Sequence, residues 1–170
     1  MGIQTPKSGI NWISKWCIMM LFENTSMIEA SVVAEILGGT AILGREIRST
    51  SDLEDLIEGG IPKAALRRTL QRVFAVASER NRILYLVVPQ ATFKRRASRL
   101  RPSESERTER LARVIAAAEM VWDDREEARE WLTQPHPELS GRTPIESALT
   151  DLGARRVEQV LDRLEYGLPV

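Results

Sequence analysis

The recurrence of apolar residues at helical spacing constrains this fold more than any other feature of the sequence. Apolar residues spaced three or four apart lie on one side of an α-helix, so such stripes predict helices that pack on one face. The clearest stripe begins at Leu111 and ends at Trp122, and another runs from Leu66 to Ala77. Good helix formers dominate the rest of the chain: leucine, alanine, arginine and glutamate. We therefore predict an all-α fold.

Serine or threonine followed three residues later by glutamate marks most of the predicted helix starts, because this pair can cap the first turn. The pairs are Ser26 and Glu29, Ser51 and Glu54, Ser103 and Glu106, and Thr143 and Glu146, the last with Pro144 between them. Asp123-Asp124 is predicted to cap a further helix. Gly153 is predicted to precede the last helix, and Gly167 to end it.

Two stretches leave the secondary structure open. Residues 40–50 fit a loop or a short strand. The compact apolar run from Ile83 to Val88, which Pro89 ends, fits either a strand or a buried helix.

We expect three parts in the chain: a peripheral extension at 1–27, a helical domain at 28–101 and a second helical domain at 102–170. The apolar stretch Ile10–Phe22 is too short to cross a membrane. It also makes a poor signal peptide, because a lysine interrupts it and no small-residue cleavage site follows. The expected location is therefore cytoplasmic, with no membrane partner.

Cys17 and His136 are each the only residue of their type in the 170-residue sequence. One cysteine cannot form a disulfide within the chain, and one histidine between two prolines lacks partners for acid–base or metal chemistry. An enzyme would need such a set of groups. We therefore assign no catalytic residue, no metal site and no cofactor, and expect that the protein is not an enzyme.

Charge is sorted along the chain although the formal net charge is zero. Residues 61–101 carry 11 basic groups against the acid Glu79, while residues 1–60 and 102–170 have net charges of −4 and −6. A local excess of this size favours binding to the phosphates of DNA. The alternative is that the basic segment packs against acidic flanks of its own chain or of a partner.

Residues 79–100 fit a helix-turn-helix whose second helix is Gln90–Leu100. In such motifs the second helix enters the major groove and its early residues reach base edges. The predicted DNA-binding residues are Gln90, Thr92, Lys94, Arg95, Arg96 and Arg99. The predicted turn, Val87-Val88-Pro89, has no glycine, and the alternative is a basic helix that faces solvent.

The last third of the chain resembles a known family. Its sequence Trp131-Leu-Thr-Gln-Pro, then Leu139, Gly141-Arg-Thr-Pro, Gly153-Ala and a valine-rich helix ending in Tyr166-Gly, is similar to the toxin-binding domain of the Xre/MbcA/ParS antitoxins. A weaker similarity to the Xre-type helical domain of ParS-like members runs through residues 42–45, 56–66 and 88–96.

This resemblance implies a type II antitoxin that neutralises a RES-domain toxin, which degrades NAD or transfers ADP-ribose. It further implies an antitoxin dimer within the complex, repression of the operon through operator DNA, and a final helix and tail that cover the NAD pocket of the toxin. The toxin-binding residues that it implies are Arg142, Arg156, Arg163, Tyr166, Gly167, Leu168, Pro169 and Val170.

The tail itself suits that role. Tyr166, Leu168 and Val170 are aromatic or apolar, and the chain ends in a carboxylate that we expect to meet an arginine of the toxin. Two alternatives stay open. The tail could be an ordinary frayed terminus, and the whole protein could be a stand-alone helix-turn-helix transcriptional regulator.

Overall fold

The computed structural model describes residues 28–166, and residues 1–27 and 167–170 lie outside that range. Within it the chain is helical and has no strand, which confirms the predicted all-α fold. The elements are α2 (Ala30–Ile36), α3 (Gly39–Leu43), α4 (Thr50–Glu58), α5 (Lys63–Val73), α6 (Ala77–Val87), α7 (Gln90–Arg95), α8 (Pro102–Trp122), α9 (Arg125–Thr133), the 3-10 turn η1 (Pro137–Leu139), α10 (Pro144–Ser147) and α11 (Asp151–Glu165).

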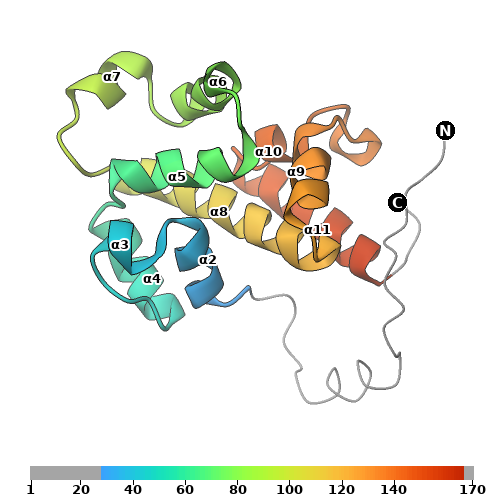
Figure 1. The fold of residues 1–170 in the computed structure, drawn as a ribbon, viewed down its shortest axis with the longest axis horizontal. Helices are drawn as coiled ribbons and strands as arrows, with labels where there is room; N and C mark the ends of the chain where they lie inside the picture. The colour runs from blue at the N-terminus through green and yellow to red at the C-terminus, as the bar shows by residue number, and fades with distance from the viewer. Residues whose placement is uncertain (1–27, 167–170) are drawn as a thin grey trace.

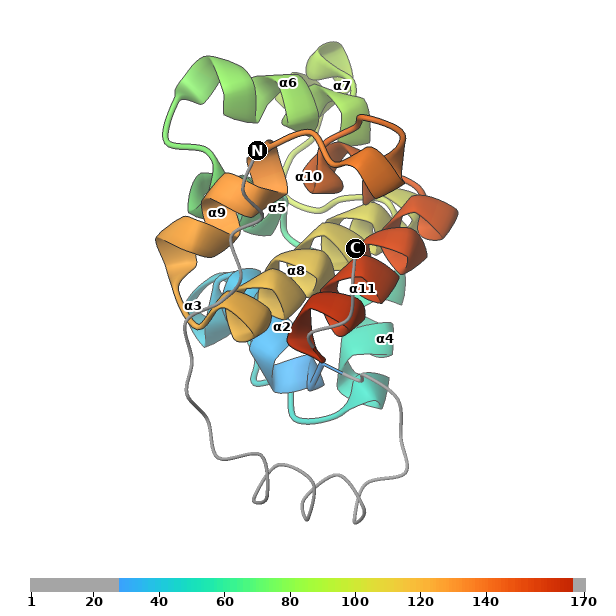
Figure 2. The same cartoon turned by 90° about the vertical axis from the view of Figure 1, so that its right-hand side faces the viewer.

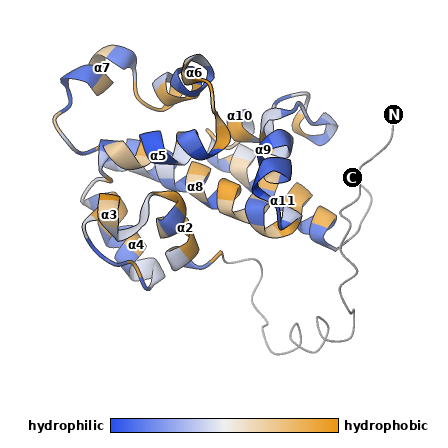
Figure 3. Cartoon of the chain, in the orientation of Figure 1, coloured by the Kyte–Doolittle hydropathy of each residue, from blue (hydrophilic) through white to orange (hydrophobic). Residues whose placement is uncertain are grey.

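Helix α8 is the centre of the fold. It packs against α2, α4, α5, α9 and α11, and the two views in Figures 1 and 2 show these helices surrounding it. Leu111 and Ile115 of the predicted stripe are buried, and alanines at 112 and 116–118 let neighbouring helices approach closely. Figure 3 shows hydrophobic residues concentrated along α8 and hydrophilic ones on the outer turns of α5 and α9.

Two of the predicted helix starts are confirmed. Thr143 caps α10, because its hydroxyl accepts a hydrogen bond from the N–H of Glu146 at 3.2 Å and Pro144 holds the first helical position. Asp124 caps α9, where its carboxylate accepts from the N–H groups of Glu126 and Glu127 at 2.7 and 2.9 Å. These caps satisfy backbone donors that the first turn of a helix leaves free.

The predicted cap of α4 at Ser51 is wrong. Ser49 is the capping residue, and its hydroxyl accepts from the N–H of Asp52 at 3.1 Å, while the Asp52 carboxylate accepts from the N–H of Ser49 at 3.0 Å. Aspartate is short but completes the same reciprocal pair, so α4 begins at Thr50.

The predicted start of α8 at Ser103 and Glu106 is also wrong. Glu104 accepts from the N–H of Arg101 at 2.8 Å, and Pro102 takes the first helical position. The fixed φ of proline suits that position, so the helix begins before the predicted serine. The predicted cap at Ser26 lies outside the described residues. Glu29, at the start of α2, makes no side-chain capping bond.

Four features differ from expectation or resolve an open alternative. Residues 39–43 form helix α3 and not a loop or strand, and the apolar run from Ile83 belongs to helix α6. Ala77, the last position of the predicted α5 stripe, is exposed at the start of α6. Gly153 lies inside α11 and does not precede it. A Cβ on Gly153 would lie 2.0 Å from the carbonyl oxygen of Ser147, so only glycine lets α11 begin this close to α10.

An extended segment at 96–100 joins α7 to α8 by crossing the start of α5. The N–H of Leu100 donates to the carbonyl of Ile61, and the N–H of Lys63 donates to that of Ser98, both at 2.8 Å. At Gly60, φ is +82° and a Cβ would lie 2.3 Å from the carbonyl oxygen of Leu100, so this crossing requires glycine. The expected helix Gln90–Leu100 is therefore wrong in length, because these backbone bonds end α7 at Arg95.

Candidate functional site

The first candidate surface is formed by α6, a tight turn at Val88-Pro89 and α7, in the order that the helix-turn-helix prediction requires. The N–H of Val88 donates to the carbonyl of Leu84 at 2.9 Å and ends α6, and Pro89 precedes the first residue of α7. Val88 is fully buried, so an apolar residue fills the turn where glycine is often found.

Helix α7 is held mainly through one ring. Phe93 is 3% exposed, and the cationic groups of Lys63 and Arg67, both on α5, lie 5.6 and 5.1 Å from its centroid. Lys63 also donates to the carbonyl oxygen of Arg96 at 2.7 Å. The basic start of α5 thus fixes α7 by cation–π and hydrogen-bond contacts.

The structure divides the predicted DNA-binding residues into two groups. Gln90, Lys94 and Arg95 are exposed and Thr92 is half-buried, all on α7. Arg96 and Arg99 lie beyond the helix.

Arg96 and Arg99 have roles in the fold itself. Arg96 pairs with Glu104 at 2.9 Å, with both side chains largely buried, and Arg99 donates to the carbonyl of Gly60 at 2.6 Å. Sequence reasoning omitted Arg67 and the exposed Arg68, which extend this basic surface onto α5.

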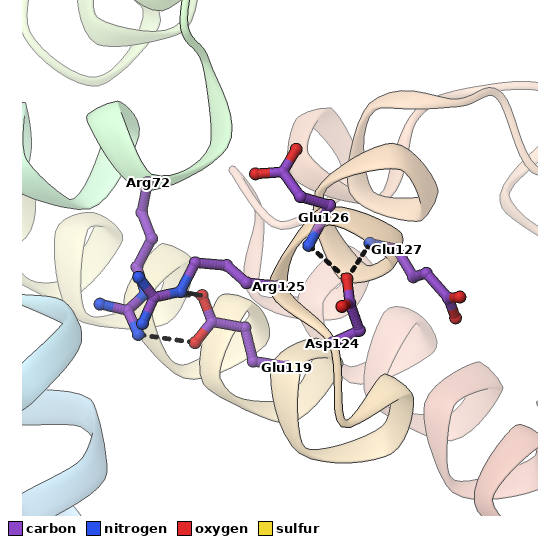
Figure 4. A network of polar contacts seen from close by, with 6 residues as sticks. All are labelled: Arg72, Glu119, Asp124, Arg125, Glu126 and Glu127. Atoms are coloured by element: carbon purple, nitrogen blue, oxygen red, sulfur yellow. Dashed lines mark hydrogen bonds and ion pairs between the residues drawn. The ribbon is translucent and has the colours of Figure 1, made fainter. Parts of the chain in front are cut away.

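Part of the basic segment packs against the acidic part of its own chain, as the alternative interpretation of the charge pattern predicted. Arg72 forms a two-point ion pair with Glu119 at 2.6 and 2.7 Å, which raises the pKa of the Arg72 guanidinium, and Arg125 approaches the same carboxylate at 3.7 Å (Figure 4). Arg82 pairs with Glu146 at 2.6 Å. These pairs join α5 and α6 to α8–α10.

Other cations of the segment have no such neighbour. Within residues 28–166, neither Arg68 nor Lys94 forms an ion pair or a side-chain hydrogen bond, and Arg95 bonds to a carbonyl of its own helix at 3.3 Å. Their charge is therefore available to a polyanion.

The second candidate surface is the outer side of α11. Its inner side packs on α8 through Ala154, Val157, Val160 and Leu161. The 3.6-residue period then places a second set of residues on the opposite side. We call this set the α11 face: Leu152, Arg156, Gln159, Arg163 and Tyr166. It brings three of the predicted toxin-binding residues onto one stripe.

Two arginines of the α11 face are oriented by the η1 turn. Arg163 pairs with the carboxylate of Glu138, and Arg156 donates to the carbonyl of Glu138 at 2.5 Å. His136 begins this turn. Its Nδ1 accepts from the N–H of Glu138 at 3.3 Å, and its ring meets Trp131 edge-on with centroids 6.0 Å apart. Burial lowers the pKa of His136, which favours the neutral ring that this acceptor contact requires.

Arg142, predicted to bind the toxin, lies at the rim of a hollow of about 220 Å³ between the η1 turn and the start of α11. Arg156 and Leu152 line the same hollow. Leu152 is 75% exposed and was missed by sequence reasoning, although an apolar residue on the polar side of a helical wheel is a detectable signal.

Tyr166 is exposed at the carboxyl end of α11. The other predicted tail residues, Gly167, Leu168, Pro169 and Val170, lie outside the described residues. In the part of the chain from 28 to 166 no group of three histidine, cysteine, aspartate or glutamate side chains is arranged to hold a metal ion, and no helix is long and apolar enough to cross a membrane.

Comparison with known proteins assigns both surfaces to described domains. Residues 117–167 match the antitoxin Xre/MbcA/ParS C-terminal toxin-binding domain, and residues 52–113 match the antitoxin Xre-like helix-turn-helix domain. An antitoxin Xre from Pseudomonas putida is 30% identical over 125 residues, which cover 72% of this chain and 76% of the relative. An antitoxin Xre from Yersinia enterocolitica is 34% identical over 85 residues, 48% of this chain and 57% of that relative. The chain therefore belongs to the Xre/MbcA/ParS-type antitoxins, with a helix-turn-helix domain ahead of the toxin-binding domain.

Proposed function

We propose that this antitoxin neutralises a RES-domain toxin that uses NAD, by covering the active site of the toxin with the α11 face and the tail that follows it. The observation that carries the proposal is the α11 face itself. Arg156 and Tyr166 are exposed and Arg163 is half-buried, and all three lie on one stripe of α11, which precedes residues 167–170 in the chain. A rigid helix that delivers a short tail suits steric occlusion, because the helix fixes where the tail begins.

The test is NAD turnover, or automodification, by a purified RES-domain toxin. The full chain and a truncation ending at Gly167 are each titrated against it, and binding is measured in parallel. We expect the full chain to inhibit and the truncation to bind but inhibit poorly. Equal inhibition by both would assign occlusion to the α11 face and refute the role of the tail. No binding by either would favour the stand-alone regulator.

We further propose that α7 binds operator DNA, through Gln90 and Thr92 at base edges and through Lys94 and Arg95 at phosphates. The support is that α7 follows the turn of a helix-turn-helix and that these two cations have no carboxylate partner among residues 28–166. Replacing both Lys94 and Arg95 with alanine should weaken operator binding and lower the slope of log K against log salt concentration by about 2.

A matched control is Arg129→Ala on α9, which removes a half-buried arginine paired with Glu126. It should leave the salt slope unchanged. If it lowers the slope as much as the α7 variants do, the attraction is a general charge effect and not a property of the helix-turn-helix. Dimerisation within the complex and a cytoplasmic location are part of the same proposal.

A further inference from the structure

We propose that Leu152, Arg142 and Arg156 form a docking surface for an acidic segment of the toxin, separate from the inhibitory tail and responsible for affinity. This inference rests on the proposed antitoxin function and deepens it, since it divides binding and inhibition between the two ends of α11.

Leu152 has no role within the described fold. It is 75% exposed, more than any other large apolar side chain among residues 28–166, and the inner side of α11 packs without it. Leu152 also lines a hollow, and a partner that covered both would remove this apolar side chain from water.

The hollow beside Leu152 is part of the fold and not a gap between mobile side chains. Leu139 and Ser147 line it and are buried, and Gly153 lines it where α11 packs closely against Ser147 of α10. Its volume of about 220 Å³ is enough for one or two side chains of a partner.

The rim of the hollow is cationic although residues 102–170 are acidic overall. The Arg142 side chain makes no ion pair or hydrogen bond within the described chain, and the Arg156 side chain is bonded to a carbonyl oxygen and not to a carboxylate. Two guanidinium groups that lack a carboxylate partner therefore lie next to an exposed leucine. Such a surface favours a partner segment that carries aspartate or glutamate beside an apolar residue.

A second copy of this chain fits the surface poorly. A two-fold dimer with this patch on its axis would bring the arginines of one copy against those of the other, which disfavours that arrangement. The toxin is the occupant that the match to a toxin-binding domain provides.

Distance separates this surface from the tail. Leu152 and Tyr166 are 14 residues apart on α11, which is about 21 Å at the helical rise. A contact at the start of α11 can therefore hold the toxin while residues 167–170 act elsewhere on it.

The experiment measures affinity of the full chain for the purified toxin by calorimetry, and inhibition of NAD turnover at saturating antitoxin. Variants Leu152→Ala and Arg142→Glu are compared with Arg155→Glu, which changes an exposed arginine of the same turn that pairs with Asp151 and does not line the hollow. We expect the first two to weaken binding by at least 10-fold, the control by less than about 3-fold, and full inhibition to return at saturation.

Wild-type affinity in Leu152→Ala and Arg142→Glu would overturn this docking surface and leave the proposed function intact. A change in the size of the free protein, seen in both variants by light scattering, would also overturn it, because the patch would then be a contact between copies. Absence of toxin binding by the wild-type chain would overturn the proposed function and the docking surface together. Circular dichroism and unfolding curves confirm that each variant is folded.

Discussion

Helices α7 and α11 both present charged side chains to solvent, but they are held in place in different ways. Helix α11 has 15 residues and packs a continuous apolar stripe on α8. Helix α7 has 6 residues, and Phe93 is its buried side chain. A helix this short is not stable by itself, so α5 and the 96–100 segment determine where α7 lies. Helix α11, proposed to bind the toxin, thus belongs to the core, and helix α7, proposed to bind DNA, is attached to it.

The largest expected effect follows from this difference in burial. Leu161→Ala should lower the free energy of unfolding by about 3 kcal/mol, because it leaves a cavity between α11 and α8. Phe93→Ala should lower the free energy of global unfolding by less, since α7 can detach while the rest stays folded. Urea unfolding and amide hydrogen exchange distinguish the two. Equal losses in both variants, with protection kept in α7, would show that α7 belongs to the core after all.

A substitution at the junction between α10 and α11 should have the next largest effect on stability. Gly153→Ala should destabilise the protein by about 2 kcal/mol, because the added methyl group collides with the carbonyl of Ser147 and pushes α11 away from α10. Gly141→Asn is the control. Gly141 also has a positive φ, but a Cβ there meets nothing within 4 Å and asparagine tolerates that conformation. Equal thermal stability of Gly153→Ala and the control would refute the steric argument.

Arg113 tests how α11 is fixed to α8 by charge. It lies 3.2 Å from Glu109 and 2.9 Å from Glu158, and burial raises the pKa of both carboxyl groups. Arg113→Ala should lower the free energy of unfolding by about 1–2 kcal/mol at pH 8, since it leaves two half-buried carboxylates without a cation.

The pH dependence of that loss has a definite sign. A carboxyl group with a raised pKa binds its proton more tightly in the folded state than in the unfolded state, so it lowers stability as pH rises through that pKa. The Arg113→Ala penalty should therefore shrink between pH 8 and pH 5. Chemical denaturation at both pH values measures it, and a penalty that grows on acidification would contradict the assignment.

The smallest expected effect concerns an ion pair between α6 and α10. Arg82 on α6 pairs with Glu146 on α10, but the Arg82 side chain is 59% exposed. The coupling energy should be about 0.5 kcal/mol or less. Because Glu146 also caps α10, a double-mutant cycle with Arg82→Ala and Glu146→Gln is needed to isolate the pair. A coupling above about 1 kcal/mol would mean that α6 depends on α10 more than burial indicates.

The sequence was sufficient for the two sides of α11, although not for its first residue, because a regular helix places residues three or four apart on the same side. Arg156, Arg163 and Tyr166 could be assigned to one stripe from their positions along the chain. The toxin-binding roles of these three residues, of Arg142 and of residues 167–170 all remain predictions.

The sequence was insufficient around α7, where tertiary contacts decide the local structure. Phe93, Ala97 and Leu100 continue a helical period, yet the backbone of residues 98–100 pairs with that of 61–63. The spacing of apolar residues near α7 does not predict that backbone pairing. Nor does it predict the contact between Arg72 and Glu119, which are 47 residues apart in the sequence. Basic residues that look alike in sequence thus divide into those that hold the fold and those that face solvent.

Helix α8 has a further consequence for the complex as a whole. The helix-turn-helix match ends at residue 113 and the toxin-binding match begins at residue 117, so the border between them falls within one unbroken helix, Pro102–Trp122. No hinge separates the two functions. If the toxin binds α11 and DNA binds α7 as proposed, α8 connects the two sites, and the angle between toxin and DNA is set by this chain as long as Phe93 keeps α7 packed on α5.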